Sequence, residues 1–140
     1  MYAIDTNIWI YCHDNRDQRK QIIAQKLVAD TSPIALPWQV GCEFLAACRK
    51  LSGAGFQEEQ AWQSLEAMQQ MVHTVILPTT SVWTLTRMLK GRHSLSVWDA
   101  LLAAACLDAG VKTLFTEDLG DNSDIEGMLI VNPFRVIGKS

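Results

Sequence analysis

Acidic residues follow short apolar segments near both ends of the chain. Asp5 comes directly after the apolar run at residues 1–4, and Asp118 closely follows the apolar run at residues 111–115. Such runs predict buried strands, and the carboxyl ends of parallel strands form the ligand-binding edge of an α/β sheet. A single Asp after a strand is weak evidence, because turns and helix caps also use Asp. A site is therefore predicted only if further acids reach the same edge.

Two further acids interrupt the apolar faces of predicted helices. Glu43 lies three residues after Val40, within an apolar face that continues at helical spacing, and Asp99 shares a face with Leu102 in the most apolar helix. Acids are rarely buried without a partner, although a Glu at the edge of the face, or an Asp that complements the helix dipole, would explain either residue alone. Asp108 lies about half a rotation from Asp99, so we expect it to face solvent without a role.

Carboxylates that meet in one partly dry pocket repel each other, and their pKa values rise unless a cation compensates them. Hard oxygen ligands suit Mg²⁺ or Mn²⁺ better than Zn²⁺, and no His or Cys pair stands at zinc-ligand spacing. One or two such ions bound by acids are typical of phosphodiester hydrolysis by activated water. The candidate catalytic residues and metal ligands are therefore Asp5, Glu43, Asp99 and Asp118.

Short apolar strands alternate with amphipathic helices along the chain. Strands are predicted at the N-terminal run and at residues 34–36, 75–78, 111–115 and 128–133. Such alternation is typical of parallel sheets with helical crossovers. The sequence therefore predicts an α/β fold, a three-layer α/β/α sandwich with a central parallel sheet of four to five short strands, as a single domain over residues 1–140.

Composition narrows the classes of function. A hydrophobic content of 49% suits a packed globule, and a net charge of −3 argues against binding nucleic acid by bulk electrostatics. A nuclease remains compatible with this charge, because bound metal ions restore attraction locally. No signal peptide, and no apolar stretch near the ~20 residues of a membrane span, is apparent. The cysteines Cys12, Cys42, Cys48 and Cys106 form no C-x-x-C pair, so we expect no disulfides and a cytoplasmic setting.

Several short motifs occur in order along the whole chain. They are Ile-Asp-Thr-Asn at 4–7, Glu43, Leu-Ser-Val-Trp-Asp-Ala-Leu-Leu-Ala-Ala-Ala at 95–105, Thr-Glu-Asp-Leu at 116–119, Ile-Glu-Gly at 125–127 and Val-Asn-Pro-Phe at 131–134. Each recurs by chance, but together and in this order they resemble the PIN-domain ribonucleases. The resemblance is greatest to the VapC-like toxins of bacterial type II toxin–antitoxin systems.

The resemblance implies a metal-dependent endoribonuclease that uses Mg²⁺ or Mn²⁺ to cleave RNA, forms homodimers and is inhibited by a cognate antitoxin. It assigns the core metal ligands to Asp5, Glu43 and Asp99, and the fourth acid to Asp118. In the last motif, T-x-D spacing selects Asp118, Glu117 should point away by strand alternation, and Asp121 ranks second. It also assigns hydrogen-bond partners of the carboxylates, which are Thr6, Asn7 and Thr116.

Helices at residues 24–28 and 41–62 would form the walls of an antitoxin groove in such a protein, with Trp38 and Trp62 as apolar contacts. Lys90, Arg92 and His93 are candidate phosphate contacts. Core packing and a solvated helix end explain these residues at least as well.

Two other functions compete with the ribonuclease. One is a PIN-like module without catalysis that binds RNA or protein, although such a scaffold has no reason to keep unpaired acids together. The other is a phosphatase with Asp5 as nucleophile. The common enzymes of that kind have a second acid two residues after the nucleophile, where this chain has Asn7.

Overall fold

A computed structural model describes residues 1–120 and 123–135 of the chain. Its centre is a six-stranded sheet in the order β3-β2-β1-β4-β6-β5. The parallel strands are β1 (Tyr2–Ile4), β2 (Ile34–Pro37), β3 (Thr74–Ile76), β4 (Thr113–Phe115) and β6 (Met128–Val131). These five strands are the predicted ones, so the α/β fold with a central parallel sheet of four to five short strands is confirmed.

The sixth strand was not predicted. β5 (Ser123–Ile125) pairs with β6 in the antiparallel direction. The two strands are joined by Glu126 and Gly127, whose φ angles of 51° and 90° are both in the left-handed region. A two-residue turn with two positive φ angles is the tight hairpin connection that matches strand twist, and glycine adopts it without steric cost. The hairpin places a short antiparallel strand at one edge of the sheet.

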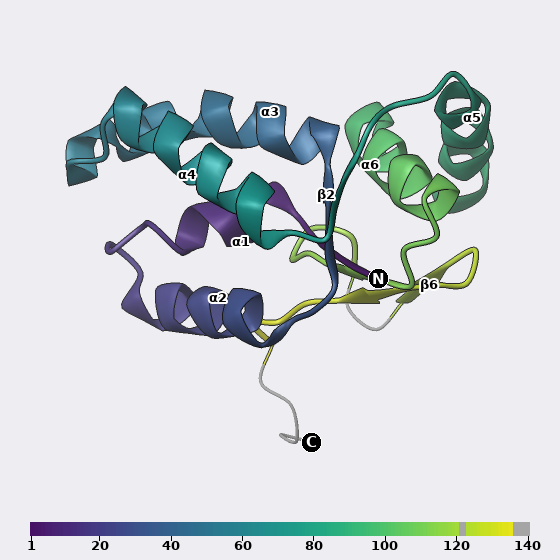
Figure 1. Cartoon of the computed structure of the whole chain (residues 1–140). Helices are drawn as coiled ribbons and strands as arrows, with labels where there is room; N and C mark the ends of the chain where they lie inside the picture. Colours follow the sequence, from purple (N-terminus) through teal and green to yellow (C-terminus); the bar gives the residue numbers. More distant parts are fainter. Residues whose placement is uncertain (121–122, 136–140) are drawn as a thin grey trace.

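Helices flank the sheet (Figure 1). They are α1 (Thr6–Tyr11), α2 (Gln18–Asp30), α3 (Trp38–Ala47), α4 (Glu58–Met71), α5 (Ser81–His93) and α6 (Val97–Asp108), with a 3₁₀ helix η1 (Cys48–Ala54) after α3. Figure 1 shows α5 and α6 paired at one end of the molecule, while α3 and α4 pair at the other. Within residues 1–120 and 123–135, no helix is both long and apolar enough to cross a membrane.

The strands are built from buried apolar residues. Ile4 of β1, Leu114 of β4 and Ile130 of β6 are fully buried, as is Phe44 on the inner face of α3. Burial of such side chains, at roughly 1.5–3 kcal/mol each, is the main force that holds the helices on the sheet. All four cysteines are free, as expected, and Cys48 and Cys106 are buried.

The sheet order places a topological switch between β1 and β4. The chain runs from β1 outward through β2 to β3, and then returns to the other side of β1 with β4. Crevices for ligands in open α/β sheets lie at the carboxyl ends of the strands beside such a switch. The residues that follow β1 and β4 therefore occupy the position where this architecture forms a site.

Candidate active site

Asp5 lies at the carboxyl end of β1, where the strand passes directly into α1. Its side chain caps that helix: the backbone N–H of Thr6 donates to Oδ1 at 2.7 Å. The hydroxyl of Thr116, after β4, donates to Oδ2 at 2.8 Å. Asp5 is only 9% exposed, so both carboxylate oxygens are fixed by partners in a nearly dry setting. Backbone and hydroxyl donors thus fix its orientation.

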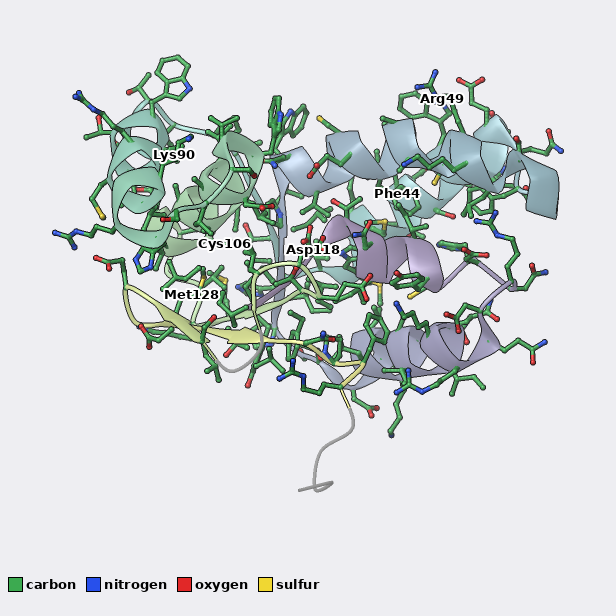
Figure 2. The ribbon with its side chains drawn as sticks, turned by 180° about the vertical axis from the view of Figure 1, so that it is seen from behind. Phe44, Arg49, Lys90, Cys106, Asp118 and Met128 are labelled. Carbon is green, nitrogen blue, oxygen red and sulfur yellow. The ribbon has the colours of Figure 1, made fainter. Side chains whose placement is uncertain are left out.

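Thr116 connects Asp5 to Asp118. Its hydroxyl donates to Asp5 and accepts a hydrogen bond from the backbone N–H of Asp118 at 3.1 Å. Asn7, in the first turn of α1, donates from Nδ2 to Oδ2 of Asp118 at 3.1 Å. Figure 2 shows Asp118 on the loop that follows β4, beside α1. Two neighbouring strands therefore bring their terminal acids to one place, with a shared hydroxyl between them.

Glu43 and Asp99 come from helices. Glu43 projects from α3, and its Oε1 accepts from the Thr6 hydroxyl and from Gln39 Nε2, each at 3.3 Å. It is exposed rather than buried in the apolar face, because that face is centred on Val40 and Phe44 and leaves Glu43 at its margin. Asp99 is half-buried in the first turn of α6, where its backbone N–H donates to the capping hydroxyl of Ser96 at 3.1 Å.

The acids predicted from the sequence line one cavity of about 440 Å³. Its lining includes Asp5, Glu43, Asp99 and Asp118, together with Thr6 and Asn7. Thr116 lies behind Asp5 as its hydrogen-bond donor. Asp108 is exposed at the other end of α6, where it accepts from the Thr79 hydroxyl at 3.3 Å, outside the cavity.

The electrostatics of the cavity favour a cation. Burial raises the pKa of Asp5 above its ordinary value, and repulsion from Asp118 and Glu43 raises it further, against the lowering effect of its two hydrogen bonds. The pKa of Asp118 is also raised, first by burial and then by the charges of Glu117 and Asp99. Raised carboxyl pKa values indicate uncompensated negative charge, which a bound cation would relieve.

The donor set fits a hard divalent ion. Carboxylate oxygens are the ligands that Mg²⁺ prefers, and Mn²⁺ accepts the same set. Over residues 1–120 and 123–135, no three His, Cys, Asp or Glu side chains stand close enough to form a ready-made cluster. The carboxylates of Asp5, Glu43 and Asp118 each accept from their own donors, so an ion would have to draw Glu43 and Asp118 inward. Both side chains are exposed, so no buried packing contact opposes such a movement.

Glu117 faces away from the cavity, as strand alternation predicts. Its carboxylate accepts from the Tyr11 hydroxyl and from Lys20 Nζ, the latter at 2.9 Å. The Lys20 ammonium also lies 4.7 Å from the ring centre of Tyr11 and 5.2 Å from that of Phe134. This cluster ties the loop that carries Asp118 to α1 and α2. Asp121, the second candidate for the fourth acid, lies outside the described residues.

Other sequence candidates lie away from the acids. Trp38 and Trp62 are about half exposed and line an apolar cavity of about 370 Å³ between α3 and α4. Arg92 and His93 pair with Glu126 at 2.7 and 3.1 Å, at the hairpin turn. Neither the Trp pair nor the basic end of α5 lines the acidic cavity.

The polar and aromatic lining residues that the sequence reasoning missed include Gln39, Arg49, Lys50 and Trp98. One signal for Lys50 was available, because it lies seven residues after Glu43 and therefore on the same helical face. Trp98 could have been noted as the neighbour of Asp99 in the capping turn.

Comparison with known proteins agrees with this fold. Residues 2–120 match the PIN domain family. A toxin–antitoxin complex from Klebsiella pneumoniae contains a chain with TM-score 0.69 and 19% identity, with 97% of this chain and 100% of that chain covered. The sarcin–ricin-loop-cleaving toxin VapC20 of Mycobacterium tuberculosis has TM-score 0.64 and 19% identity, with coverage of 85% and 92%. VapBC2 from Rickettsia felis, bound to a promoter DNA fragment, contains a chain with TM-score 0.64 and 16% identity, with 92% of this chain and 96% of that chain covered.

The chain belongs to the PIN domain family. Its fold is similar to that of VapC20 and to that of the matched chain in the VapBC2 structure. A search of curated protein sequences finds no match.

Proposed function

We propose that the protein is a Mg²⁺- or Mn²⁺-dependent endoribonuclease that acts as the toxin of a toxin–antitoxin pair. The observation that carries this proposal is the convergence of Asp5, Glu43, Asp99 and Asp118 on one cavity beside the switch point of the sheet. Membership of the PIN domain family and the likeness to an RNA-cleaving toxin support it.

In this proposal Asp5, Glu43 and Asp99 hold the metal, and Asp118 completes a second position or orients water. When bound, one or two such ions supply activation of water and stabilisation of charge on the phosphate and leaving oxygens. The chain itself fixes the ligands: Thr116 holds Asp5 and the backbone of Asp118 through one hydroxyl. Asn7 turns the Asp118 carboxylate toward α1 and the cavity. Such hydrogen bonds orient ligands and tune their affinity for a metal.

An antitoxin and a second copy of the chain are the proposed partners. The structural relatives from Klebsiella pneumoniae and Rickettsia felis are complexes of toxin with antitoxin. On this chain the apolar cavity between α3 and α4, bordered by Trp38 and Trp62, suits an apolar segment of such an inhibitor. Aromatic side chains of this kind frequently dominate binding energy at interfaces.

The test is cleavage of a mixed RNA pool by purified protein, free of antitoxin, in Mg²⁺, in Mn²⁺ and in EDTA. Asp99→Asn is the test variant and Asp108→Asn its matched control, because both acids lie on α6 but only Asp99 lines the cavity. We expect cleavage in either metal by the wild type and by Asp108→Asn, and none in EDTA or by Asp99→Asn. Absence of cleavage in all conditions would favour a non-catalytic module that binds RNA or protein.

A further inference from the structure

Cationic, amide and aromatic side chains line the acidic cavity beside the carboxylates. They comprise Gln39, Arg49, Lys50 and Trp98 and are called the rim of the cavity. Gln39, near the start of α3, and Lys50, in η1, both line it, so it extends along this helical segment. At 1.5–2 Å per residue, the separation of Gln39 and Lys50 is about 16–20 Å. This length exceeds the extent of one nucleotide, about 3.4 Å along a stacked strand. The lining of this cavity of about 440 Å³ therefore reaches past the position of a single phosphate.

Two cations at one end of the cavity form no ion pair. Arg49 and Lys50 line the same cavity as the acids, yet neither takes part in a salt bridge among the described residues. The side chains of Lys20 and Lys26, by contrast, each bind a carboxylate at 2.9 Å. Arg49 donates from Nε to the backbone carbonyl of Ala46 at 3.4 Å, which leaves its charge uncompensated. Exposed cations beside an acidic cavity are available for an anionic ligand.

An aromatic side chain stands in the wall on the α6 side. Trp98 is 64% exposed although it lies in the first turn of the otherwise apolar α6. Its backbone carbonyl accepts a hydrogen bond from Gln39 Nε2 at 3.1 Å, and the same amide group donates to Glu43 at 3.3 Å. Gln39 thus fixes the Trp98 backbone relative to one of the acids. In the described part of the chain, the indole ring stacks on no other aromatic side chain.

We propose that this rim binds single-stranded RNA, with an unpaired base stacked on Trp98 and backbone phosphates on Lys50 and Arg49. The inference rests on the proposed nuclease function, because it treats the acids as the place where the scissile phosphate sits. The acids would hold a cation that binds one phosphate, the cationic end suits a neighbouring phosphate, and the exposed indole suits a base. These three features together match the parts of a nucleotide chain. Stacking platforms and cationic grooves are how proteins bind single strands without strict sequence preference.

The overall charge makes such local contacts necessary. A chain with a net charge of −3 does not attract RNA over its whole surface. Affinity must then come from the few groups near the cavity. Bases in a duplex are stacked on each other and hidden, whereas those of loops and single strands are free to stack on protein aromatics. The rim therefore selects unpaired segments of RNA over duplex.

Binding is measured by fluorescence anisotropy with a labelled single-stranded oligoribonucleotide in Ca²⁺, and KM and kcat for its cleavage are measured in Mg²⁺. Trp98→Ala should weaken binding about 5- to 150-fold, the range for loss of one stacked base, and should raise KM more than it lowers kcat. Trp98→Phe should retain most of the affinity. Trp83→Ala is the matched control, because Trp83 is 71% exposed on α5 and does not line the cavity.

The cations have their own quantitative readout. Replacement of both Arg49 and Lys50 by Gln should reduce the slope of log K against log salt concentration by about 1.4, or 0.7 per lost phosphate contact on a single strand. Lys90→Gln is the control, since Lys90 is an exposed cation on α5. Figure 2 shows Arg49 and Lys90 on opposite sides of the molecule. The slope for Lys90→Gln should equal that of the wild type.

Unchanged affinity and KM in Trp98→Ala would overturn the inference, and so would equal binding of the same strand annealed to its complement. A loss of affinity that accompanies a change in oligomeric state would overturn it as well, because Trp98 would then be a protein–protein contact. If the wild type cleaves RNA in Mg²⁺ while Trp98→Ala has wild-type KM, this inference fails and the nuclease stands. If the wild type cleaves nothing, the proposed function itself fails.

Discussion

Asp5→Asn should stabilise the metal-free protein. Burial and the neighbouring acids raise the pKa of Asp5 in the folded protein, so ionised Asp5 disfavours folding. The stability associated with its neutral form is present at pH values below 3.8, its ordinary pKa, and is lost as pH rises through the higher folded value. Asparagine cannot ionise, so it removes this loss. The gain should be absent at low pH and should grow toward neutrality.

The magnitude follows from two opposing effects. Asn keeps one oxygen for the Thr6 N–H, but its amide must donate to the Thr116 hydroxyl, which also accepts from the Asp118 backbone. Loss of a hydrogen bond to a charged group costs about 1.5–3 kcal/mol, while relief of a buried unpaired charge returns several kcal/mol. The net stabilisation should be about 1–2 kcal/mol, a rise in Tm of roughly 3–8 °C for a chain of this size.

The assay is thermal melting, followed by calorimetry or fluorescence, in EDTA between pH 4 and pH 8. Asp108→Asn is the control, because it makes the same change at an exposed position and should leave the Tm nearly unchanged. The measurement is then repeated with Mg²⁺, which should raise the Tm of the wild type and leave that of Asp5→Asn nearly unchanged, because ligand binding stabilises only the form that binds. A Tm of Asp5→Asn below that of the wild type in EDTA at pH 8 would refute the reasoning.

Further outcomes are expected from the same geometry. Because the pKa values of Asp5 and Asp118 are both raised, protons compete with metal, so the Mg²⁺-dependent rise in Tm should be smaller at pH 5 than at pH 8. Lys20→Met keeps the apolar stem but breaks the ion pair with Glu117 in the loop after β4. It should lower the free energy of unfolding in urea by about 1–2 kcal/mol, a value between those of exposed and buried ion pairs. It should also weaken Mn²⁺ binding in titration calorimetry. Phe44→Ala, at a fully buried position, should cost about 3–5 kcal/mol in the same unfolding assay. Asp108→Asn should leave the RNA cleavage rate within about twofold of the wild type, since exposed substitutions away from a site have small effects.

Much of the fold could be predicted because local pattern and burial agree. The five parallel strands are short, mostly apolar runs, and each places at least one residue in the buried core, so their composition is informative. β5 could not be found this way, since Ser123–Ile125 contains one apolar residue and owes its pairing to β6. The sequence signal for β5 is the turn at Glu126 and Gly127. This turn indicates a hairpin only if a strand that pairs with β6 is already expected before it.

The meeting of the acids that follow strands could be predicted from the sequence, whereas the residues at the rim of the cavity could not. Asp5 and Asp118 meet because β1 and β4 are neighbours, which follows from the parallel architecture. The ion pair of Glu117 with Lys20, almost a hundred residues earlier in the chain, could not be predicted, because no local pattern encodes that contact. Lys50 and Trp98 come together with the acids only through the packing of η1 and α6 around the cavity. Conversely, Trp62 fits an apolar helical pattern but remains half exposed.

The two edges of the sheet have a consequence for assembly. β3 and β5 are three residues long, and β5 carries Asp124, whose side chain is occupied by the N–H of Gly127 at 2.7 Å. Edges so short, one of them bearing a charge, offer few free backbone groups to a strand from another molecule. Growth of the sheet across chains is therefore disfavoured, and contacts with other protein molecules are directed to the helical faces.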